Sequence, residues 1–157
     1  MNINIRKATM NDLSVIQDLN HELFMWDYPN DKALNTNWPY EKAGEYYFRD
    51  KINGVEGVCY VVESDGQVVG YVAGKVNKEI DKRDTLLRSE LENIYIKPEF
   101  RGSGVGKKLT DHLISWSKEL GAQNMTVSAY HNNEGAIGFY KECGFNLYAV
   151  TLEKTLS

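Results

Sequence analysis

The chain contains only two cysteines and three prolines in 157 residues, and it has neither a basic excess nor a long apolar run. Cys59 and Cys143 have no disulfide-framework spacing, which favours a reducing, cytoplasmic setting. A formal net charge of −4 gives no footprint for nucleic acid. No stretch approaches a membrane span, and the N-terminus lacks an apolar run of signal-peptide type. We therefore expect one cytoplasmic domain over residues 1–157, with no membrane or nucleic-acid partner.

Hydrophobic periodicity predicts strands that alternate with helices, and therefore a mixed α/β sheet. We expect strands at residues 3–5, 57–63, 67–76, 91–96, 124–130 and 145–153, the last of which closes the sheet. Helices are expected at residues 13–23, 39–52, 105–120 and 136–143. Residues 24–37 are expected to form a loop or a broken helix, and residues 77–87 a solvated loop.

A glycine-rich turn joins the strand at residues 91–96 to the helix that follows it. Its sequence, residues 101–106, is R-G-S-G-V-G, with Lys107 and Lys108 directly after it. The first amides of a helix have no internal acceptor and carry the positive end of the dipole, so this turn predicts a phosphate-binding site. A Walker loop and a dinucleotide fingerprint both require other glycine spacings.

Two ordered motifs resemble those of the GNAT superfamily of N-acetyltransferases. The turn is similar to that family's [RQ]-x-x-G-x-[GA] loop for acetyl-CoA, and residues 133–145 are similar to its N-x-x-A-x-x-F-Y-x-x-x-G-F segment. The resemblance implies the GNAT fold, a mixed, mostly antiparallel central sheet with splayed central strands and flanking helices. It also implies acetyl-CoA as cosubstrate, no metal, a small-molecule amine as acceptor and a homodimer.

The same resemblance implies which residues meet the cofactor. The pantetheine arm is expected along the central strand, the pyrophosphate on the turn, and the thiol end near Asn133. The expected cofactor-binding residues are Ile94, Tyr95, Ile96, Arg101, Gly102, Ser103, Gly104, Val105, Gly106, Lys107, Asn133 and Ala136. An ordinary helix N-cap is the alternative role for Asn133, and the two roles are compatible.

Acyl transfer to an amine needs a proton donor for the departing thiolate and an acceptor for the amine proton. Tyr140 stands in the family's F-Y dipeptide and is the candidate acid, with a core tyrosine as the alternative. Glu92 is the candidate base, acting through a water, with a structural ion pair as the alternative.

The segment around Glu92 resembles diamine acetyltransferases, which modify spermidine and spermine. This likeness implies that Glu92 contacts the polyamine as well, and that the groove is lined by Trp26, Asp27, Thr126, Val127 and Ser128. A solvated helix face with an exposed loop is the alternative for the acidic residues near Asp27. Acetylation of a protein N-terminus, a lysine or an aminoglycoside, and a non-catalytic CoA-binding sensor, also remain open. His21, His112 and His131 are isolated, so no metal site is expected.

Overall fold

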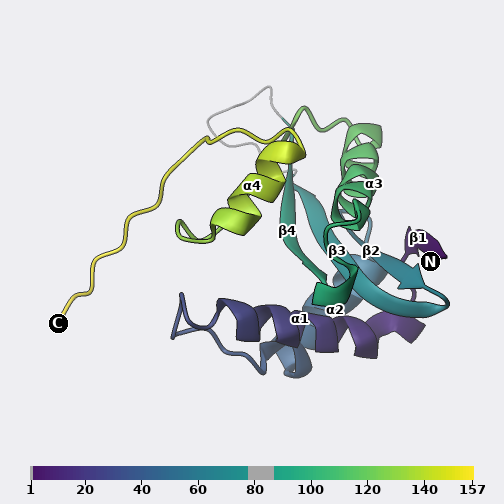
Figure 1. Cartoon of the computed structure of the whole chain (residues 1–157), viewed down its shortest axis with the longest axis horizontal. Coiled ribbons are helices and arrows are strands. Elements are labelled where there is room, and N and C mark those ends of the chain that lie inside the picture. The colour runs from purple at the N-terminus through teal and green to yellow at the C-terminus, as the bar shows by residue number, and fades with distance from the viewer. Residues whose placement is uncertain (1, 78–86) are drawn as a thin grey trace.

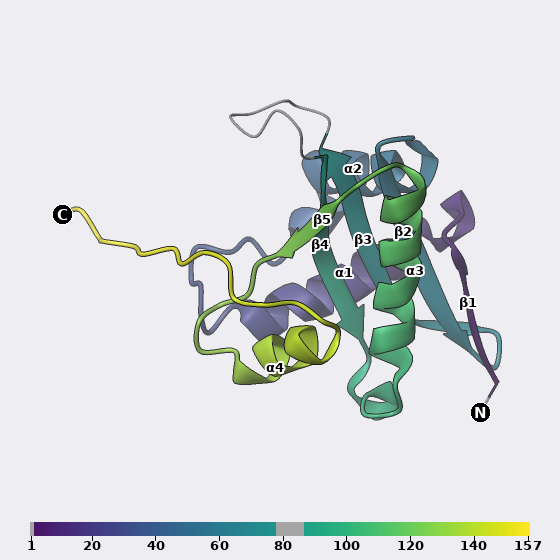
Figure 2. The same cartoon turned by 90° about the horizontal axis from the view of Figure 1, so that it is seen from above.

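The computed structural model describes residues 2–77 and 87–157, and its centre is a five-stranded sheet in the order β1-β2-β3-β4-β5 (Figures 1 and 2). The strands are β1 (Ile3–Lys7), β2 (Gly57–Ser64), β3 (Gln67–Asn77), β4 (Arg88–Ile96) and β5 (Asn124–Val127). Each pair is antiparallel except β4 and β5, which are parallel. The mixed sheet confirms the expected fold class. The loop expected at residues 77–87 falls almost wholly outside the described residues.

Four α-helices cover the two faces of this sheet (Figure 1). They are α1 (Leu13–Asp27), α2 (Lys42–Asn53), α3 (Val105–Glu119) and α4 (Glu134–Glu142). The apolar stripe of α3, with Leu109 and Leu113 fully buried, packs on one face of the sheet together with the partly buried Tyr140 of α4. Ile16 and Leu19 of α1 and Phe48 of α2 pack on the other face. Two apolar clusters, separated by the sheet, therefore form the core.

The connection before α2 differs from the expected helix at residues 39–52. Trp38–Tyr40 forms a separate 3₁₀ turn, and Glu41 is extended before α2 begins at Lys42. The first turn of α2 lies directly on this 3₁₀ turn, because a Cβ on Gly44 would collide with the Trp38 carbonyl oxygen. Close backbone packing thus separates the two helical pieces, and only glycine permits it.

The end of α1 extends further than the sequence pattern indicates. The helix continues to Asp27 and therefore includes the first residues of the segment expected to be a loop or a broken helix. The chain enters α1 through a 3₁₀ turn, Met10–Asp12, which begins with a capping box in which the Thr9 amide donates to Asp12 Oδ2 over 2.8 Å. The continuation matters because it carries Trp26 and Asp27 on a rigid element.

The prediction of a closing strand at residues 145–153 is wrong. Residues 145–157 form no regular secondary structure and leave the body of the molecule as an extended tail (Figures 1 and 2). Gly144 ends α4 with a φ of +98°, and the chain turns away there. The sequence pattern indicates that these residues suit a strand, but it does not indicate whether a partner strand is within reach.

Candidate active site

The glycine turn presents a continuous run of unpaired amides. Gly102 and Gly104 have φ values of +80° and +82°, which non-glycine residues rarely adopt, and Gly104 caps α3. Within residues 2–77 and 87–157, no amide from residue 102 to residue 107 donates to an acceptor of the chain, and the first such bond is Lys108 N–H to the Gly104 carbonyl at 3.1 Å. These amides, at the positive end of α3, fit the oxygens of a pyrophosphate.

The central strand carries a bulge, after which it diverges from β5. Ala73 of β3 faces Asn93, whereas Gly74 faces Leu91, so Glu92 is the extra residue of β4. The pairing of β4 with β5 ends at Leu91 and Val127. From Asn93 to Ile96 the β5 side of β4 is therefore an open edge among the described residues. This edge is what a pantetheine arm needs if it is to bind as an added strand. The divergence of the two strands also explains why β5 ends at Val127 instead of continuing to residue 130.

Arg101 lies beside the turn but points toward β4 and α1. Its Nε donates to the Ile96 carbonyl at 2.7 Å, and its guanidinium lies 5.1 Å from the Tyr95 ring centroid and 5.5 Å from that of Trp26. Tyr95 belongs to β4 and Trp26 to α1. The Arg101 side chain therefore ties the turn to both elements, which is a second task beside the cofactor contact expected of it.

Helix α4 brings the second motif to the same region. Asn133 caps the helix, with its Oδ1 accepting from the Ala136 amide at 3.1 Å. This confirms the capping role and leaves the two amide hydrogens of Asn133 available. Gly106 of α3 lies close to α4, since a Cβ there would come within 3.0 Å of the Phe139 ring. The turn and the second motif are thus held side by side.

The hydroxyl of Tyr140 lies in a region shared with the end of α1. Burial, followed by the negative charge of Asp27, raises the pKa of Tyr140 to about 12. Within the described part of the chain this hydroxyl makes no hydrogen bond, so it is available to a ligand. A phenol with a raised pKa keeps its proton at neutral pH, as an acid for a departing thiolate must.

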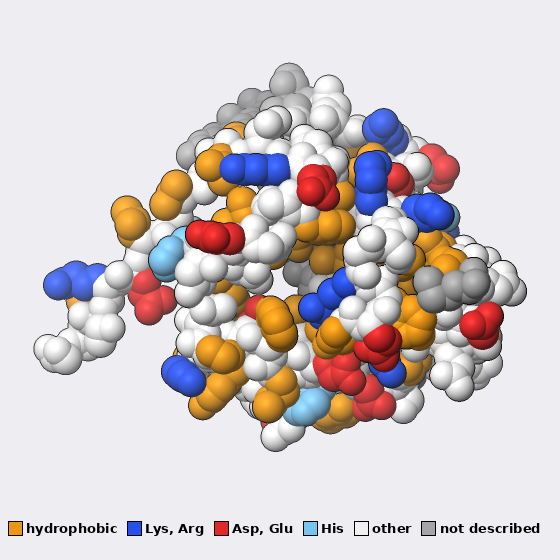
Figure 3. Space-filling model, in the orientation of Figure 1, with side chains coloured by type: hydrophobic (Ala, Val, Ile, Leu, Met, Phe, Trp, Pro, Cys, Tyr) orange, Lys and Arg blue, Asp and Glu red, His pale blue; other side chains and the backbone are white. Residues whose placement is uncertain are grey.

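Asp27, the last residue of α1, is the second titratable group of this region. Burial raises the pKa of its carboxyl above the usual value, and no lysine or arginine among the described residues forms an ion pair with it. Figure 3 shows that the surface is hollowed between α1 and α4. A partly desolvated carboxylate without a counter-ion, next to Tyr140, is suited to bind a cation.

Two loops form the outer wall of this region. The Tyr130 hydroxyl donates to Asp31 Oδ2 at 3.0 Å, and Asn132 Nδ2 donates to Asn30 Oδ1 at 2.8 Å. Burial and the Asp31 carboxylate raise the pKa of Tyr130 to about 12. Thr126, Val127 and Ser128 lead from β5 into this wall. Tyr130 could not be identified from the sequence, because its partner lies 99 positions away.

Glu92 is held in an ion-pair cluster on the opposite face of β4 from the core packing of Tyr140. Its Oε1 is 3.0 Å from Lys51 Nζ of α2, and its Oε2 is 3.7 Å from Lys75 Nζ of β3. The Lys51 side chain is only 8% exposed and also lies over the Tyr47 ring at 4.7 Å. Because each carboxylate oxygen lies within ion-pair distance of a lysine, the geometry supports the ion-pair alternative for Glu92, although Oε1 is buried without a geometrically aligned hydrogen bond. The role of Glu92 as a base stays a prediction.

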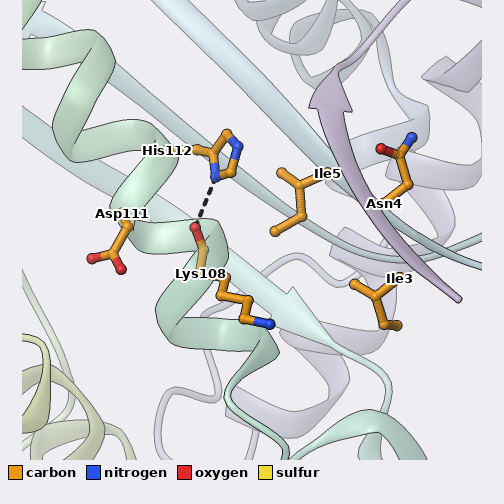
Figure 4. Close-up of a pocket in the computed structure, with 6 residues that line it drawn as sticks. All are labelled: Ile3, Asn4, Ile5, Lys108, Asp111 and His112. Carbon is orange, nitrogen blue, oxygen red and sulfur yellow. Dashed lines mark hydrogen bonds between the residues drawn. The ribbon is translucent and has the colours of Figure 1, made fainter. Parts of the chain in front are cut away.

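A separate surface pocket of about 360 Å³ lies at the other end of the sheet (Figure 4). It is lined by Ile3, Asn4 and Ile5 of β1 and by Lys108, Asp111 and His112 of α3. His112 Nδ1 donates to the Lys108 carbonyl at 2.9 Å. Since β1 and β5 are opposite edges of the sheet, this pocket is distinct from the region of Tyr140.

No group of three or more His, Cys, Asp or Glu side chains in residues 2–77 and 87–157 could hold a metal ion. In the same ranges, no helix has the length and apolar character needed to cross a membrane.

Comparisons with known proteins agree with this geometry. Residues 18–145 match the model of the acetyltransferase (GNAT) family. An uncharacterized N-acetyltransferase of Methanocaldococcus jannaschii is 34% identical over 107 residues, which are 67% of this chain and 46% of the relative. An N-alpha-acetyltransferase of Sulfurisphaera tokodaii is 27% identical over 146 residues, 90% of this chain and 78% of the relative. The chain thus spans about half the length of the first of these relatives.

Solved structures show the same fold. A mutant of the BH1408 protein of Bacillus halodurans superposes with a TM-score of 0.86 at 18% identity, covering 98% of this chain and 99% of the other. The aminoglycoside N-acetyltransferase AAC(6')-Iy in complex with CoA superposes with a TM-score of 0.77 at 17% identity, covering 99% of this chain and 95% of the other. At these identities the likeness concerns the fold alone.

Proposed function

Since the chain belongs to the acetyltransferase (GNAT) family, we propose that it transfers the acetyl group of acetyl-CoA to a small cationic amine, with a diamine or polyamine as first choice. The observation that carries this proposal is the pair formed by Asp27 and Tyr140. A carboxylate that burial has partly desolvated, and that has no counter-ion among the described residues, gains free energy when an ammonium group approaches. The proton donor lies beside it, so an amine bound at Asp27 is held near the reacting carbonyl.

The chain fits acetyl-CoA at two places. The amides of residues 102–107 would hold the pyrophosphate, and the open edge of β4 at Ile94 and Ile96 would pair with the pantetheine arm. The bound cosubstrate supplies an acetyl thioester. Asn133, which caps α4, would offer its amide hydrogens to the thiol end. Ala136 and Tyr95 would also contact the cosubstrate.

The residues of the chain then supply three functions to a direct attack in a ternary complex. Asp27 binds and orients the amine, and a water molecule in the hollow takes the amine proton. Tyr140 holds its proton at the hydroxyl and donates it to the departing sulfur. Glu92, fixed by Lys51 and Lys75, maintains the bulge that opens the edge of β4. We thus propose Glu92 as a positioning residue rather than as the base.

Further carboxylates favour an acceptor with more than one cation. Burial raises the pKa of Tyr95, and the nearby carboxylate of Glu22 raises it further. Asp31 follows α1 in the outer wall. Together with Asp27 they place negative charge along the end of α1, which also carries the exposed Trp26 ring. A second ammonium group of a polyamine would meet this surface. The net charge of −4 makes a nucleic-acid acceptor unfavourable.

A peptide N-terminus is the second candidate acceptor, and one finding favours it. The relative from Sulfurisphaera tokodaii that matches 90% of this chain carries the name N-alpha-acetyltransferase. An N-terminal ammonium is also a cation, so Asp27 would bind it in the same way. The two candidates differ in what lies beyond the first ammonium, a second cation or a peptide backbone.

Release of CoA, measured with a panel of acceptors, tests the proposal. The panel contains spermidine, spermine, putrescine, an aminoglycoside, a peptide with a free N-terminus and a neutral amino acid. We expect turnover with the polyamines and a KM for them that rises at least about 10-fold in Asp27→Asn, the effect of about 1.4 kcal/mol of lost binding. Asp65→Asn, at the β2–β3 turn, is the matched control. Turnover with peptides alone would exclude the polyamine acceptor, and an unchanged KM in Asp27→Asn would exclude a role of the Asp27 carboxylate in binding the amine.

We also propose that the protein works as a homodimer.

A further inference from the structure

Arg101 is a cation without a counter-ion at the start of the glycine turn. Among the described residues, no carboxylate forms an ion pair with it. A guanidinium has N–H donors at Nε, Nη1 and Nη2, and only Nε–H is used, in the bond to the Ile96 carbonyl at 2.7 Å. The donors on Nη1 and Nη2 have no acceptor in residues 2–77 and 87–157. The side chain therefore keeps its charge and most of its hydrogen-bonding capacity for a ligand.

Aromatic rings hold this guanidinium where a carboxylate is more usual. Its Cζ lies 5.1 Å from the centroid of the Tyr95 ring in β4 and 5.5 Å from that of the Trp26 ring in α1. A ring attracts a cation through its quadrupole and has no net charge, so it orients the guanidinium without neutralising it. A carboxylate in the same place would also cancel the attraction of the guanidinium for a phosphate. The arrangement is thus suited to present an oriented positive charge to an anion.

The bond from Arg101 to Ile96 joins the turn to the open edge of β4. Lys97 N–H donates to the Val69 carbonyl at 3.0 Å, which fixes the register where β3 and β4 meet the turn. Residues that bond to the partner strand alternate with residues that face away from it in an antiparallel pair. The backbone groups of Ile94 and Ile96 therefore face the side that β5 leaves open. Arg101 occupies the last carbonyl of this edge, and it thereby sets the position of the turn relative to the edge.

Trp26 lies at the surface, in contrast to Tyr95. Trp26 is 59% exposed, whereas Tyr95 is 8% exposed and belongs to one of the two core clusters. In the described part of the chain, the contact with Arg101 is the only ring or cation contact of the Trp26 side chain. Packing of the core therefore does not account for this tryptophan. Its position directly before Asp27 places the contact on the helix that carries the candidate acceptor carboxylate.

We propose that Trp26 is a positioning residue for the pyrophosphate of acetyl-CoA, and that it acts through Arg101. The Trp26 ring holds the guanidinium beside the amides of residues 102–107, so less conformational entropy is lost when the phosphates bind. Trp26 itself does not touch the cosubstrate in this role. A ring has two faces, so contact with Arg101 leaves the other face for an acceptor. The role requires only that the chain binds acetyl-CoA, whatever the acceptor is.

Calorimetric titration with CoA tests this role without any acceptor. Trp26→Leu should raise the Kd for CoA by about 4-fold, since a cation–π contact at an exposed site is a weak one. Trp26→Phe keeps an aromatic face and should stay within about 2-fold of the parent. Met25→Leu is the matched control, because Met25 is 53% exposed on the same helix, and it should leave the Kd unchanged. The Tm of each variant shows whether it is folded.

A double-mutant cycle shows whether Trp26 acts through Arg101. Arg101→Met should raise the Kd for CoA by about 10-fold, and Trp26→Leu added to it should change the Kd by less than about 1.5-fold. An unchanged Kd in Trp26→Leu alone would overturn the proposal. The same loss from Trp26→Leu in both backgrounds would mean that the ring contacts CoA itself, which would overturn it as well. A loss in Trp26→Phe or Met25→Leu as large as that in Trp26→Leu would do so too. None of these outcomes depends on turnover, so they are separate from the test of the amine acceptor.

Discussion

Replacing Lys51 by methionine should lower the free energy of unfolding by about 3 kcal/mol. Lys51 Nζ is 3.0 Å from Glu92 Oε1, and both side chains are largely buried, with 8% and 17% exposure. Methionine keeps much of the apolar stem that lies against Gly57, so the change removes mainly the charge. Glu92 then loses its nearer partner and retains Lys75 at 3.7 Å.

The magnitude follows from the geometry. At an effective dielectric constant of about 20, two unit charges 3.0 Å apart attract each other by about 5 kcal/mol. In the variant no lysine has to be desolvated, which offsets part of this loss. Lys75, whose side chain is 41% exposed, compensates another part by moving closer to Glu92. A net loss of about 3 kcal/mol corresponds to a fall in Tm of about 6–12 °C for a chain of this size.

A double-mutant cycle measures the pair directly. Denaturant unfolding of the parent, Lys51→Met, Glu92→Gln and the double variant should give a coupling free energy of about 2 kcal/mol. Arg49→Met on the same helix is the control, because its ion pair with Glu45 is exposed and should be worth about 0.3–0.5 kcal/mol. A coupling within about 0.5 kcal/mol of zero would refute the reasoning. Glu92→Gln also tests the base role, since a base would flatten the rising limb of the pH–rate profile and a positioning residue would leave its shape unchanged.

Four further outcomes are expected. Tyr140→Phe should reduce kcat by about 100-fold while the Kd for acetyl-CoA, measured by calorimetry, stays within about 3-fold, and a large loss of affinity would contradict the acid role. Because the pKa of Tyr140 is raised to about 12, its proton should not limit turnover below about pH 11, and a falling limb near pH 10 would show an unperturbed phenol. Gly104→Val should abolish acetyl-CoA binding. The control is Gly66→Val, because Gly66 has a φ of +83° and Gly104 one of +82°, so both variants should lose similar stability. If only Gly104→Val loses binding, the cause is obstruction of the amides of the turn and not backbone strain. Hydrogen bonds from Arg6 hold the pKa of Asp12 below its usual value, so this stabilisation is present above about pH 4 and is lost as the pH falls. In acid, the Tm of the parent should therefore fall more steeply than that of Asp12→Asn. An equal or shallower fall would disprove this contribution.

The sequence predicted the parts of the site that are local. The glycine turn, the helix after it and the cap at Asn133 depend on residues within a few positions of one another, and the structure confirms each of them. The divergence of β4 and β5 at Glu92, expected from the family resemblance, is present as well.

The sequence could not predict pairs that the fold brings together from distant segments. Lys51 ends a charged helix and has the pattern of a solvated residue, yet tertiary packing buries it beside Glu92. Tyr130 and Asp31 are 99 positions apart. The predicted strand at residues 145–153 is absent for a related reason, because a strand-forming sequence specifies a local conformation and not the position of a partner strand.

The open edge of β4 makes the sheet incomplete without its ligand. Backbone groups from Asn93 to Ile96 would gain hydrogen bonds only when a pantetheine arm occupies the gap left by β5. A ligand that binds only the folded state stabilises it by about 2.7 kcal/mol at 100 times its Kd. Resistance to proteases should therefore rise and fall with the surrounding acetyl-CoA concentration. The lifetime of the protein would then depend on how much acetyl donor is available.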